Sequence, residues 1–161
     1  MTTAEFAVPI EERYFEDYLP GSVYEYGAVT VTEPEIVEFA TRFDPQPMHT
    51  DPEQAAQGRY GGIIASGWHT VGIAMRLFVD YYLSKVASLA SPGVDEIRWP
   101  NPVRPGDTLR LRVSILEARP SRSKPDRGVI RTLIEAVNQN DELVLSMIGM
   151  SILRRRQPGS V

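Results

Sequence analysis

The feature that most constrains the fold of this chain is a long apolar segment with helical character and no polar face. It extends from about residue 67 to residue 88, and apolar side chains recur nearly all round the helix that it would form. Other structure has to surround such a helix, because its surface would otherwise expose apolar area to water. Arg76, Asp80 and Lys85 interrupt the segment and make it too charged to span a bilayer. We therefore expect a central helix around which the rest of the chain is wrapped.

The chain that follows this segment has the residue pattern of β-strands. Several stretches favour β-branched or aliphatic residues, some with an alternation of period two. These stretches cover residues 94–99, 108–118, 128–138 and 143–153. Residues 138–141, Asn-Gln-Asn-Asp, predict a hairpin loop, and the Pro-, Ser- and charge-rich residues 119–127 predict an exposed connection.

The chain before the apolar segment predicts one strand and two short helices. Residues 22–31 have the composition of a strand. Thr32 and Glu35 form a capping-box pattern for a helix that ends before Asp44. Asp51 as N-cap and Pro52 at the first helical position predict a second helix.

This order of elements predicts an α+β fold in which a curved antiparallel sheet is wrapped around one long central helix. We expect a single domain over residues 1–161, with an N-terminal extension at 1–20 and a frayed tail at 154–161. Such a sheet leaves an edge and one flank of the helix to be covered. A homodimer or a higher homo-oligomer is therefore expected.

The composition excludes several classes of function. A net charge of −4 and a pI of about 5.2 argue against nucleic acid or an anionic membrane as partner. The chain has no cysteine, which excludes disulfides, thiolate nucleophiles and cysteine-ligated metal sites. The acidic N-terminus lacks a basic and then apolar signal pattern, so we expect a cytoplasmic protein.

Asp44 and His49 are the first candidates for chemistry. They lie five positions apart in a loop stiffened by Pro45 and Pro47, each of which restricts its own φ and the preceding residue. Such a loop can hold a carboxylate and an imidazole at a fixed separation, as a shared catalytic water requires. The structural alternative is that Asp44 caps a turn and His49 hydrogen-bonds to backbone carbonyls.

The glycine-rich residues 61–68 are the second candidate. Glycines before a helix allow a ligand to approach its free N-terminal amides, which bind developing negative charge. The alternative is a tight turn that needs small residues for packing. With the acid/base pair, an amide site supplies the parts needed to add water to, or remove it from, an enoyl or hydroxyacyl thioester. The candidate oxyanion and substrate-binding residues are Gly67, whose amide would be the donor, with Ser66, Gly62, Ile64 and Trp68.

Other polar residues have weaker patterns. His69 either lines the pocket or is structural, and the structural interpretation is favoured because buried polar groups usually find partners. A zinc site from Asp44, His49 and His69 lacks the HExxH spacing, so no metal is expected. Ser66 lacks the Gly-x-Ser-x-Gly context of a hydrolytic nucleophile. Arg98 and Arg104 are candidates for coenzyme A phosphates, with exposed solvated charge as the alternative.

Taken together, these motifs resemble the MaoC-like hydratases and dehydratases, which include R-specific enoyl-CoA hydratases. Residues 44–49, Asp-Pro-Gln-Pro-Met-His, are similar to the family signature Asp-x-Asn-Pro-x-His. Residues 51–56 and 61–67 match the short helix and the glycine-rich turn that follow it, and residues 103–109 resemble a later strand segment. The resemblance implies a hot-dog fold, water activation by Asp44 and His49, and a Gly67 amide that polarises the thioester oxygen. Gln46 replaces the usual Asn, and Ser66 stands where many members have His.

Three functions remain open from the sequence. The first is reversible hydration of a 2-enoyl thioester, or the reverse dehydration, on coenzyme A or acyl carrier protein, with no cofactor other than the substrate's own coenzyme A. The second is a hot-dog acyl-CoA thioesterase. The third is a non-catalytic protein that binds acyl thioesters. The bulky Trp68 would shorten an acyl tunnel, which affects the identity of the substrate more than the type of reaction.

Overall fold

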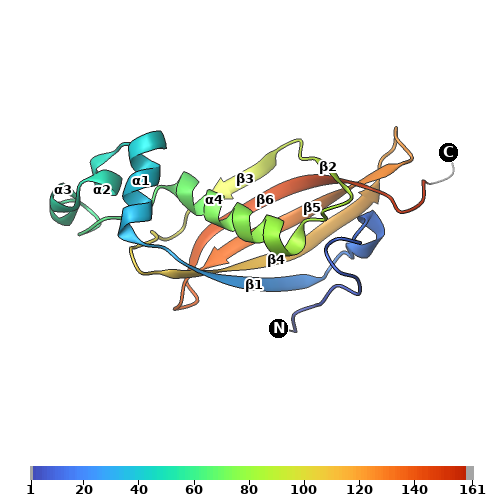
Figure 1. The fold of residues 1–161 in the computed structure, drawn as a ribbon, viewed down its shortest axis with the longest axis horizontal. Helices are drawn as coiled ribbons and strands as arrows, with labels where there is room; N and C mark the ends of the chain where they lie inside the picture. Colours follow the sequence, from blue (N-terminus) through green and yellow to red (C-terminus); the bar gives the residue numbers. More distant parts are fainter. Residues whose placement is uncertain (1, 159–161) are drawn as a thin grey trace.

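The computed structural model describes residues 2–158, in which a six-stranded antiparallel sheet lies against a central helix (Figure 1). The strand order is β1-β4-β5-β6-β2, and β3 also pairs with β6. The strands are β1 (Val23–Thr30), β2 (Ser88–Ala90), β3 (Val94–Arg98), β4 (Thr108–Pro120), β5 (Arg127–Val137) and β6 (Leu143–Arg154). This arrangement confirms the predicted fold of a curved sheet around one helix.

The predicted strands are confirmed, with ends shifted by a few residues. Alternate residues of β4 and β5 are buried, as expected for strands with one face against a helix. The hairpin at residues 138–141 joins β5 to β6, and the amides of Asn140 and Glu142 both donate to the Asn138 side-chain oxygen. A side chain that bonds to its own turn in this way explains why the Asn-rich loop was recognisable from sequence.

The central helix is shorter than predicted. Helix α4 covers Gly67–Leu77 and continues as the π-helical segment η2 (Phe78–Tyr82), after which Leu83 is extended. The Ser84 hydroxyl accepts hydrogen bonds from the amides of Val86 and Ala87 and so forms a turn. The prediction of a helix to residue 88 was therefore wrong over its last turns. None of the helices in residues 2–158 is both long enough and apolar enough to cross a membrane.

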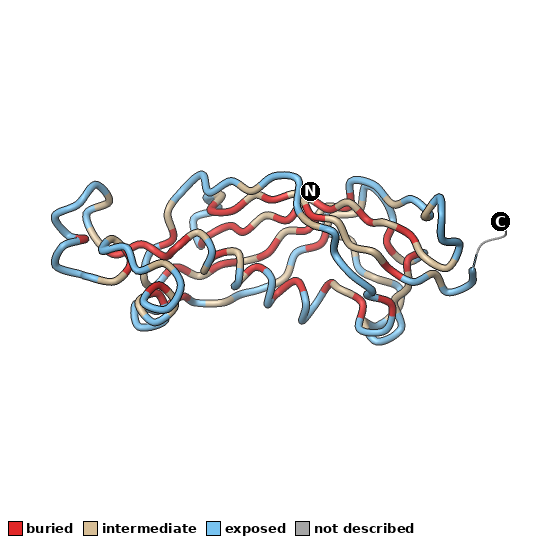
Figure 2. Tube along the Cα trace, turned by 90° about the horizontal axis from the view of Figure 1, so that it is seen from above, coloured by how far each residue is buried: buried red, intermediate tan, exposed pale blue. Residues whose placement is uncertain are grey.

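The prediction that the helix is surrounded on all sides is also wrong for the single chain. Figure 2 shows buried residues where the helix and the sheet meet, with exposed residues along the outer side of the helix. The buried positions of α4 are Thr70, Ala74 and Leu77. Trp68 and Met75, on the same helix, keep 57% and 45% of their surface exposed.

Three short helices lie together at one end of the molecule (Figure 1): α1 (Glu33–Phe43), α2 (Pro47–Thr50) and α3 (Pro52–Gln57). The capping box at α1 is confirmed, because Thr32 and Glu35 exchange side-chain and backbone hydrogen bonds. The cap of α3 is confirmed too, since the Asp51 side chain accepts hydrogen bonds from the backbone amides of Glu53 and Gln54. Helix α2 corrects the prediction of a loop: Pro47 starts a single helical turn that contains His49.

The N-terminal segment is part of the core. The short helix η1 (Phe15–Asp17) presents a Phe15 side chain that is only 8% exposed, and Tyr18 is 1% exposed. The Phe15 ring lies against Gly128 of β5, where a Cβ atom would overlap it. Sequence alone indicated only an extension, because the partner of Phe15 is more than a hundred positions away in the chain.

Part of the chain expected to fray is held by hydrogen bonds. Arg154 ends β6, and its amide donates to the Ala87 carbonyl. The Arg156 amide donates to Glu16, and its guanidinium pairs with Asp17. These contacts correct the expected frayed tail at its first residues, while residues 159–161 lie outside the described residues.

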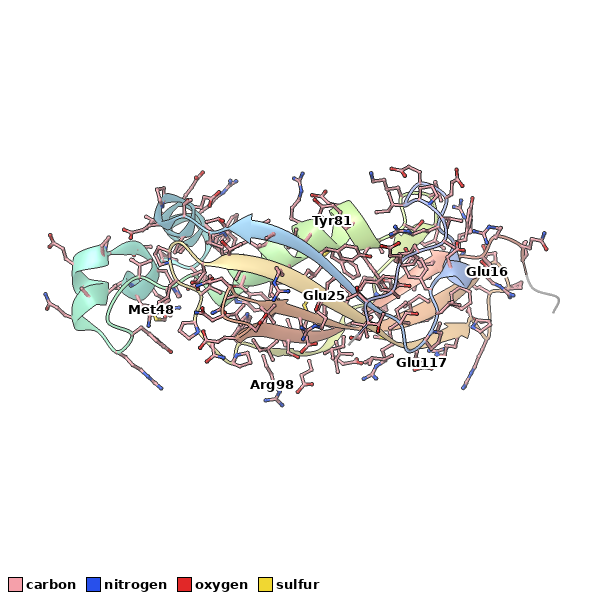
Figure 3. All side chains as sticks on the ribbon, turned by 90° about the horizontal axis from the view of Figure 1, so that it is seen from below. Glu16, Glu25, Met48, Tyr81, Arg98 and Glu117 are labelled. Atoms are coloured by element: carbon pink, nitrogen blue, oxygen red, sulfur yellow. The ribbon has the colours of Figure 1, made fainter. Side chains whose placement is uncertain are left out.

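A group of aromatic side chains lies between the middle of the molecule, where Figure 3 labels Tyr81, and the end opposite to α1–α3. Figure 3 shows Glu16 of η1 at this end and Met48 of α2 at the other. The Tyr18 hydroxyl donates to the Tyr82 carbonyl, and the Arg13 guanidinium donates to the carbonyls of Tyr81 and Tyr82. We call this group the N-terminal aromatic cluster; its rings are Phe6, Tyr18, Tyr24, Tyr26, Tyr81 and Tyr82.

Candidate active site

Asp44 and His49 lie side by side at the junction of α1 and α2. Asp44 is the C-cap of α1, and His49 belongs to the single turn of α2 that Pro47 begins. The Asp44 Oδ2 atom is 3.4 Å from His49 Nε2, and the His49 side chain is 5% exposed against 21% for Asp44. The stiff segment between them therefore fixes a buried imidazole next to a partly accessible carboxylate.

The tautomer of His49 follows from its hydrogen bond. Its Nδ1 atom lies 2.6 Å from the Ile64 carbonyl oxygen. A carbonyl only accepts, so Nδ1 carries the hydrogen and the neutral ring keeps a lone pair on Nε2. Nε2 and the ionised Asp44 are then both acceptors, and a water molecule can donate one hydrogen to each. If Nε2 takes up a proton, the imidazolium donates directly to Asp44.

Two side chains donate to the Asp44 carboxylate. Gln46 Nε2 donates to Oδ1 at 2.7 Å, and Ser66 Oγ donates to Oδ2 at 2.7 Å. The hydrogen bond from Gln46 is the largest cause of a lowered pKa of Asp44, with further lowering by Ser66 and by His49, against the opposing effect of burial. Asp44 is therefore ionised near neutral pH.

A cavity of about 560 Å³ opens beside this pair. That volume is within the range of small-molecule sites. The cavity is lined by polar and apolar side chains in similar numbers. The polar ones are Asp44, Gln46, His49, Arg59, Tyr60, Thr70 and Asn101. The remaining lining residues are Met48, Ile64, Ala65, Gly67, Trp68, Trp99, Pro100, Pro102 and Val103. The cavity thus joins the acid/base pair to the start of α4.

The N-terminus of α4 meets the cavity at Gly67. The first amides of an α-helix have no acceptor within the helix, and the Ser66 side chain makes no capping hydrogen bond to them. Trp99 packs against Gly67, where an added Cβ atom would lie 2.5 Å from the indole, and its Nε1 donates to the Gly67 carbonyl at 3.0 Å. Gly67 is therefore required for the close approach of Trp99.

The other residues of the glycine-rich segment divide into two groups. Ile64 and Trp68 line the cavity, and Trp68 packs edge-on against Trp99 with ring centroids 5.4 Å apart. Gly62 and Ser66 are not among its lining residues. Ser66 is fully buried, and its hydroxyl donates to Asp44.

The arginines chosen from sequence lie outside the cavity lining. Arg98 of β3 pairs with Glu96 and projects away from the body of the molecule (Figure 3), while the Arg104 side chain lies near Gly62. Arg59 is the arginine that lines the cavity, and sequence reasoning missed it. Its position two residues before the glycine pair was the available signal.

His69 is not among the residues that line the cavity. Its ring stacks on Phe39 of α1 with centroids 4.8 Å apart, and its buried Nδ1 has no hydrogen-bond partner within residues 2–158. Burial lowers the pKa of His69, although the Glu35 charge opposes this effect. Its observed contacts are thus with the neighbouring helix. Among the described residues, no three His, Cys, Asp or Glu side chains group together as a metal site would need.

Comparison with known proteins places this geometry in a family. The model of the MaoC like domain matches residues 17–138. The MaoC-like dehydratase from Rhodospirillum rubrum is 37% identical, with a TM-score of 0.83 over 90% of this chain and 99% of that chain. An uncharacterized Bacillus subtilis protein, YdeM, is 32% identical over 78% of this chain and 88% of its own length. The 3-hydroxyacyl-thioester dehydratase Z of Mycobacterium tuberculosis is 33% identical over 66% of this chain and 72% of its own length.

The match spans most of the fold and includes both the Asp44–His49 segment and helix α4. The Rhodospirillum rubrum dehydratase has the same arrangement of sheet and helix over 90% of this chain. This chain therefore belongs to the MaoC-like hydratase and dehydratase family and has the hot-dog fold.

Proposed function

We propose that the protein catalyses the reversible hydration of a 2-enoyl thioester, or the dehydration of the matching hydroxyacyl thioester. The observation that carries the proposal is the 3.4 Å pairing of an Asp44 oxygen with His49 Nε2 at the wall of a cavity that also reaches Gly67. Two neighbouring acceptors at the cavity wall can both receive hydrogen bonds from a water in the cavity, and the helix N-terminus suits the oxygen that becomes negative.

In the proposed hydration, the water between Asp44 and His49 attacks C3 of the enoyl group. His49 Nε2 accepts a proton from this water, and the Asp44 charge stabilises the imidazolium that forms. The π electrons of the C2–C3 bond move towards the thioester carbonyl, whose oxygen accepts a hydrogen bond from the Gly67 amide. The proton held by the pair is then delivered to C2, so that the pair is regenerated and one water has been added.

The carrier is proposed to be coenzyme A or acyl carrier protein, because both present the same thioester on a pantetheine arm. The substrate brings this group with it, and the proposed steps need no other cofactor. Arg104 beside Gly62 remains the candidate contact for coenzyme A phosphates, whereas Arg98 is paired with Glu96. Arg59 adds a cation within the cavity itself.

The assay that tests the function follows the enoyl-thioester absorbance and the free thiol together, over a panel of 2-enoyl-CoA substrates. We expect the absorbance to fall without thiol release, because water adds to the double bond and the thioester stays intact. Thiol release would assign the protein to the thioesterases instead. Tight binding of acyl-CoA without turnover would support a non-catalytic binding protein.

We also propose that the protein forms a homodimer through the outer side of α4 and the β2–β3 edge. Apolar side chains are exposed there, and three of them, Met75, Leu89 and Val94, line a second cavity of about 250 Å³. The exposed residues are Met75, Val79, Leu89 and Val94, with exposures of 37% to 48%. A second copy would cover both this apolar surface and the free strand edge.

The dimer predicts that Val94→Lys lowers the mass in solution towards the 18.0 kDa of one chain. Light scattering after size-exclusion chromatography measures this mass. The matched control is Leu116→Lys on β4, where an apolar side chain of similar exposure lies outside the second cavity. A monomeric parent protein, or a control variant that dissociates equally, would contradict this interface.

A further inference from the structure

Ser66 occupies a position where serine normally caps a helix, yet its hydroxyl does not do so. It is the N-cap residue of α4 and has the extended ψ of 139° that capping requires, but its side chain accepts no amide hydrogen bond. The hydroxyl donates instead to Asp44 Oδ2 at 2.7 Å, across 22 positions of the chain. A favourable local interaction is thus replaced by a contact to the proposed acid/base pair.

The surroundings of Ser66 hold this hydroxyl in place. Ser66 has no exposed surface, so no bulk water competes for the hydroxyl. Its carbonyl accepts the Thr70 amide at 3.1 Å, and the preceding Ala65 amide donates to the Val103 carbonyl at 2.8 Å. The donor therefore projects from a backbone that is fixed on both sides.

The bond involves the oxygen of Asp44 that faces His49. Gln46 from the same loop holds Oδ1, while Ser66 from the start of α4 holds Oδ2 at the 3.4 Å gap to His49 Nε2. A carboxylate held by one donor at each oxygen cannot rotate about its Cβ–Cγ bond without losing both bonds. The Ser66 contact thereby ties the orientation of the acid/base pair to the helix that supplies the oxyanion amide.

We propose that Ser66 is a positioning residue whose hydroxyl fixes the Asp44 carboxylate next to His49. Because this hydroxyl does not cap α4, the first backbone amides of the helix are left free to bind the thioester oxygen. This role rests on the proposed function. It differs from the substrate contact expected from sequence, because buried Ser66 acts through Asp44 and does not line the cavity.

The consequence for pH dependence has a definite sign. The charged or titratable residues that line the cavity with Asp44 are His49 from α2 and, after α3, Arg59 and Tyr60. Ser66 donates to the ionised carboxylate and so lowers the pKa of Asp44. Loss of the hydroxyl raises this pKa, so the acidic limb of the kcat/KM profile, below which Asp44 is protonated, moves to higher pH.

The test compares Ser66→Ala with Ser66→Thr, which keeps a hydroxyl. We expect Ser66→Ala to lower kcat by about 10- to 100-fold, as small misplacements of catalytic groups do, with a smaller change in KM. Ser66→Thr should recover most of this loss and the parent pH profile. The control is Ser84→Ala, which removes another buried serine hydroxyl, in the turn after η2, and should leave the pH profile unchanged.

A carboxyl NMR titration of Asp44 without substrate separates this proposal from the proposed function. A higher midpoint in Ser66→Ala than in the parent supports the Ser66 contact even if no enoyl thioester is turned over. An unchanged midpoint, or an unchanged kcat and acidic limb in a folded Ser66→Ala variant, overturns it. In an Asp44→Asn background, Ser66→Ala should cause little further loss, and a full additional loss would also overturn it.

Discussion

Asp44→Asn and His49→Gln are each expected to lower kcat for hydration by about 10²- to 10⁴-fold, the usual contribution of a general acid or base. Asn at position 44 keeps the shape of the side chain and one of the two acceptor oxygens that Gln46 and Ser66 use, but removes the charge that stabilises the imidazolium. Gln at position 49 removes the basic lone pair that the Ile64 carbonyl directs to Nε2. Steady-state kinetics on enoyl-CoA, with circular dichroism as a check on folding, measure both effects.

The matched control for Asp44→Asn is Asp51→Asn. Asp51 caps α3 close to the site but does not line the cavity, and Asn caps a helix about as well as Asp. Its kcat should stay within about threefold of the parent, well below the loss expected for a general acid or base. The double variant of Asp44 and His49 should lose little more than the worse single variant, because the two residues act as a unit. A folded Asp44→Asn protein with nearly full activity would contradict the proposed mechanism.

Phe15→Ala is expected to lower the free energy of unfolding by about 3–5 kcal/mol, as other removals of buried aromatic rings do. Phe15 is 8% exposed, and its ring covers Gly128 of β5, so truncation leaves a cavity between η1 and the sheet. Urea denaturation at a fixed protein concentration measures the change, because dissociation of an oligomer would otherwise shift the transition.

Leu19→Ala serves as the control in the same segment, since Leu19 is 60% exposed. Its effect should stay within about 0.5 kcal/mol, as for most surface substitutions. An equally small effect of Phe15→Ala would mean that the N-terminal segment does not contribute to the core.

The sequence predicted those elements whose signals are local. The capping box of Thr32 and Glu35 and the period-two alternation of β4 each lie within one element, and both are found as expected. The end of the central helix was not predictable in this way. Leu83 and Val86 fit the apolar pattern of a helix equally well, and only the Ser84 turn and the pairing of β2 with β6 decide against it.

The site was predictable to the same extent. Asp44 and His49 are close in sequence, and two prolines restrict the chain between them. The contacts that complete the site are long-range: Ser66 to Asp44, the Ile64 carbonyl to His49, and Trp99 on Gly67. A residue pattern within a short stretch of sequence does not predict such contacts, because they depend on how α4 and the loop after β3 pack against α2.

The N-terminal aromatic cluster lies between the middle of the molecule and the end opposite to the α1–α3 helices, and this position bears on how the fold can change over time. The effects of two substitutions on the free energy of unfolding are nearly additive when the two sites share no contacts. Substitutions that stabilise an active site, in contrast, often reduce activity. Here the Arg13 contacts and the rings around Tyr82 stabilise the molecule outside the cavity that Asp44 lines. Selection can therefore alter the substrate preference at the cavity while compensating changes accumulate in the N-terminal aromatic cluster, so that new specificities need not weaken the fold.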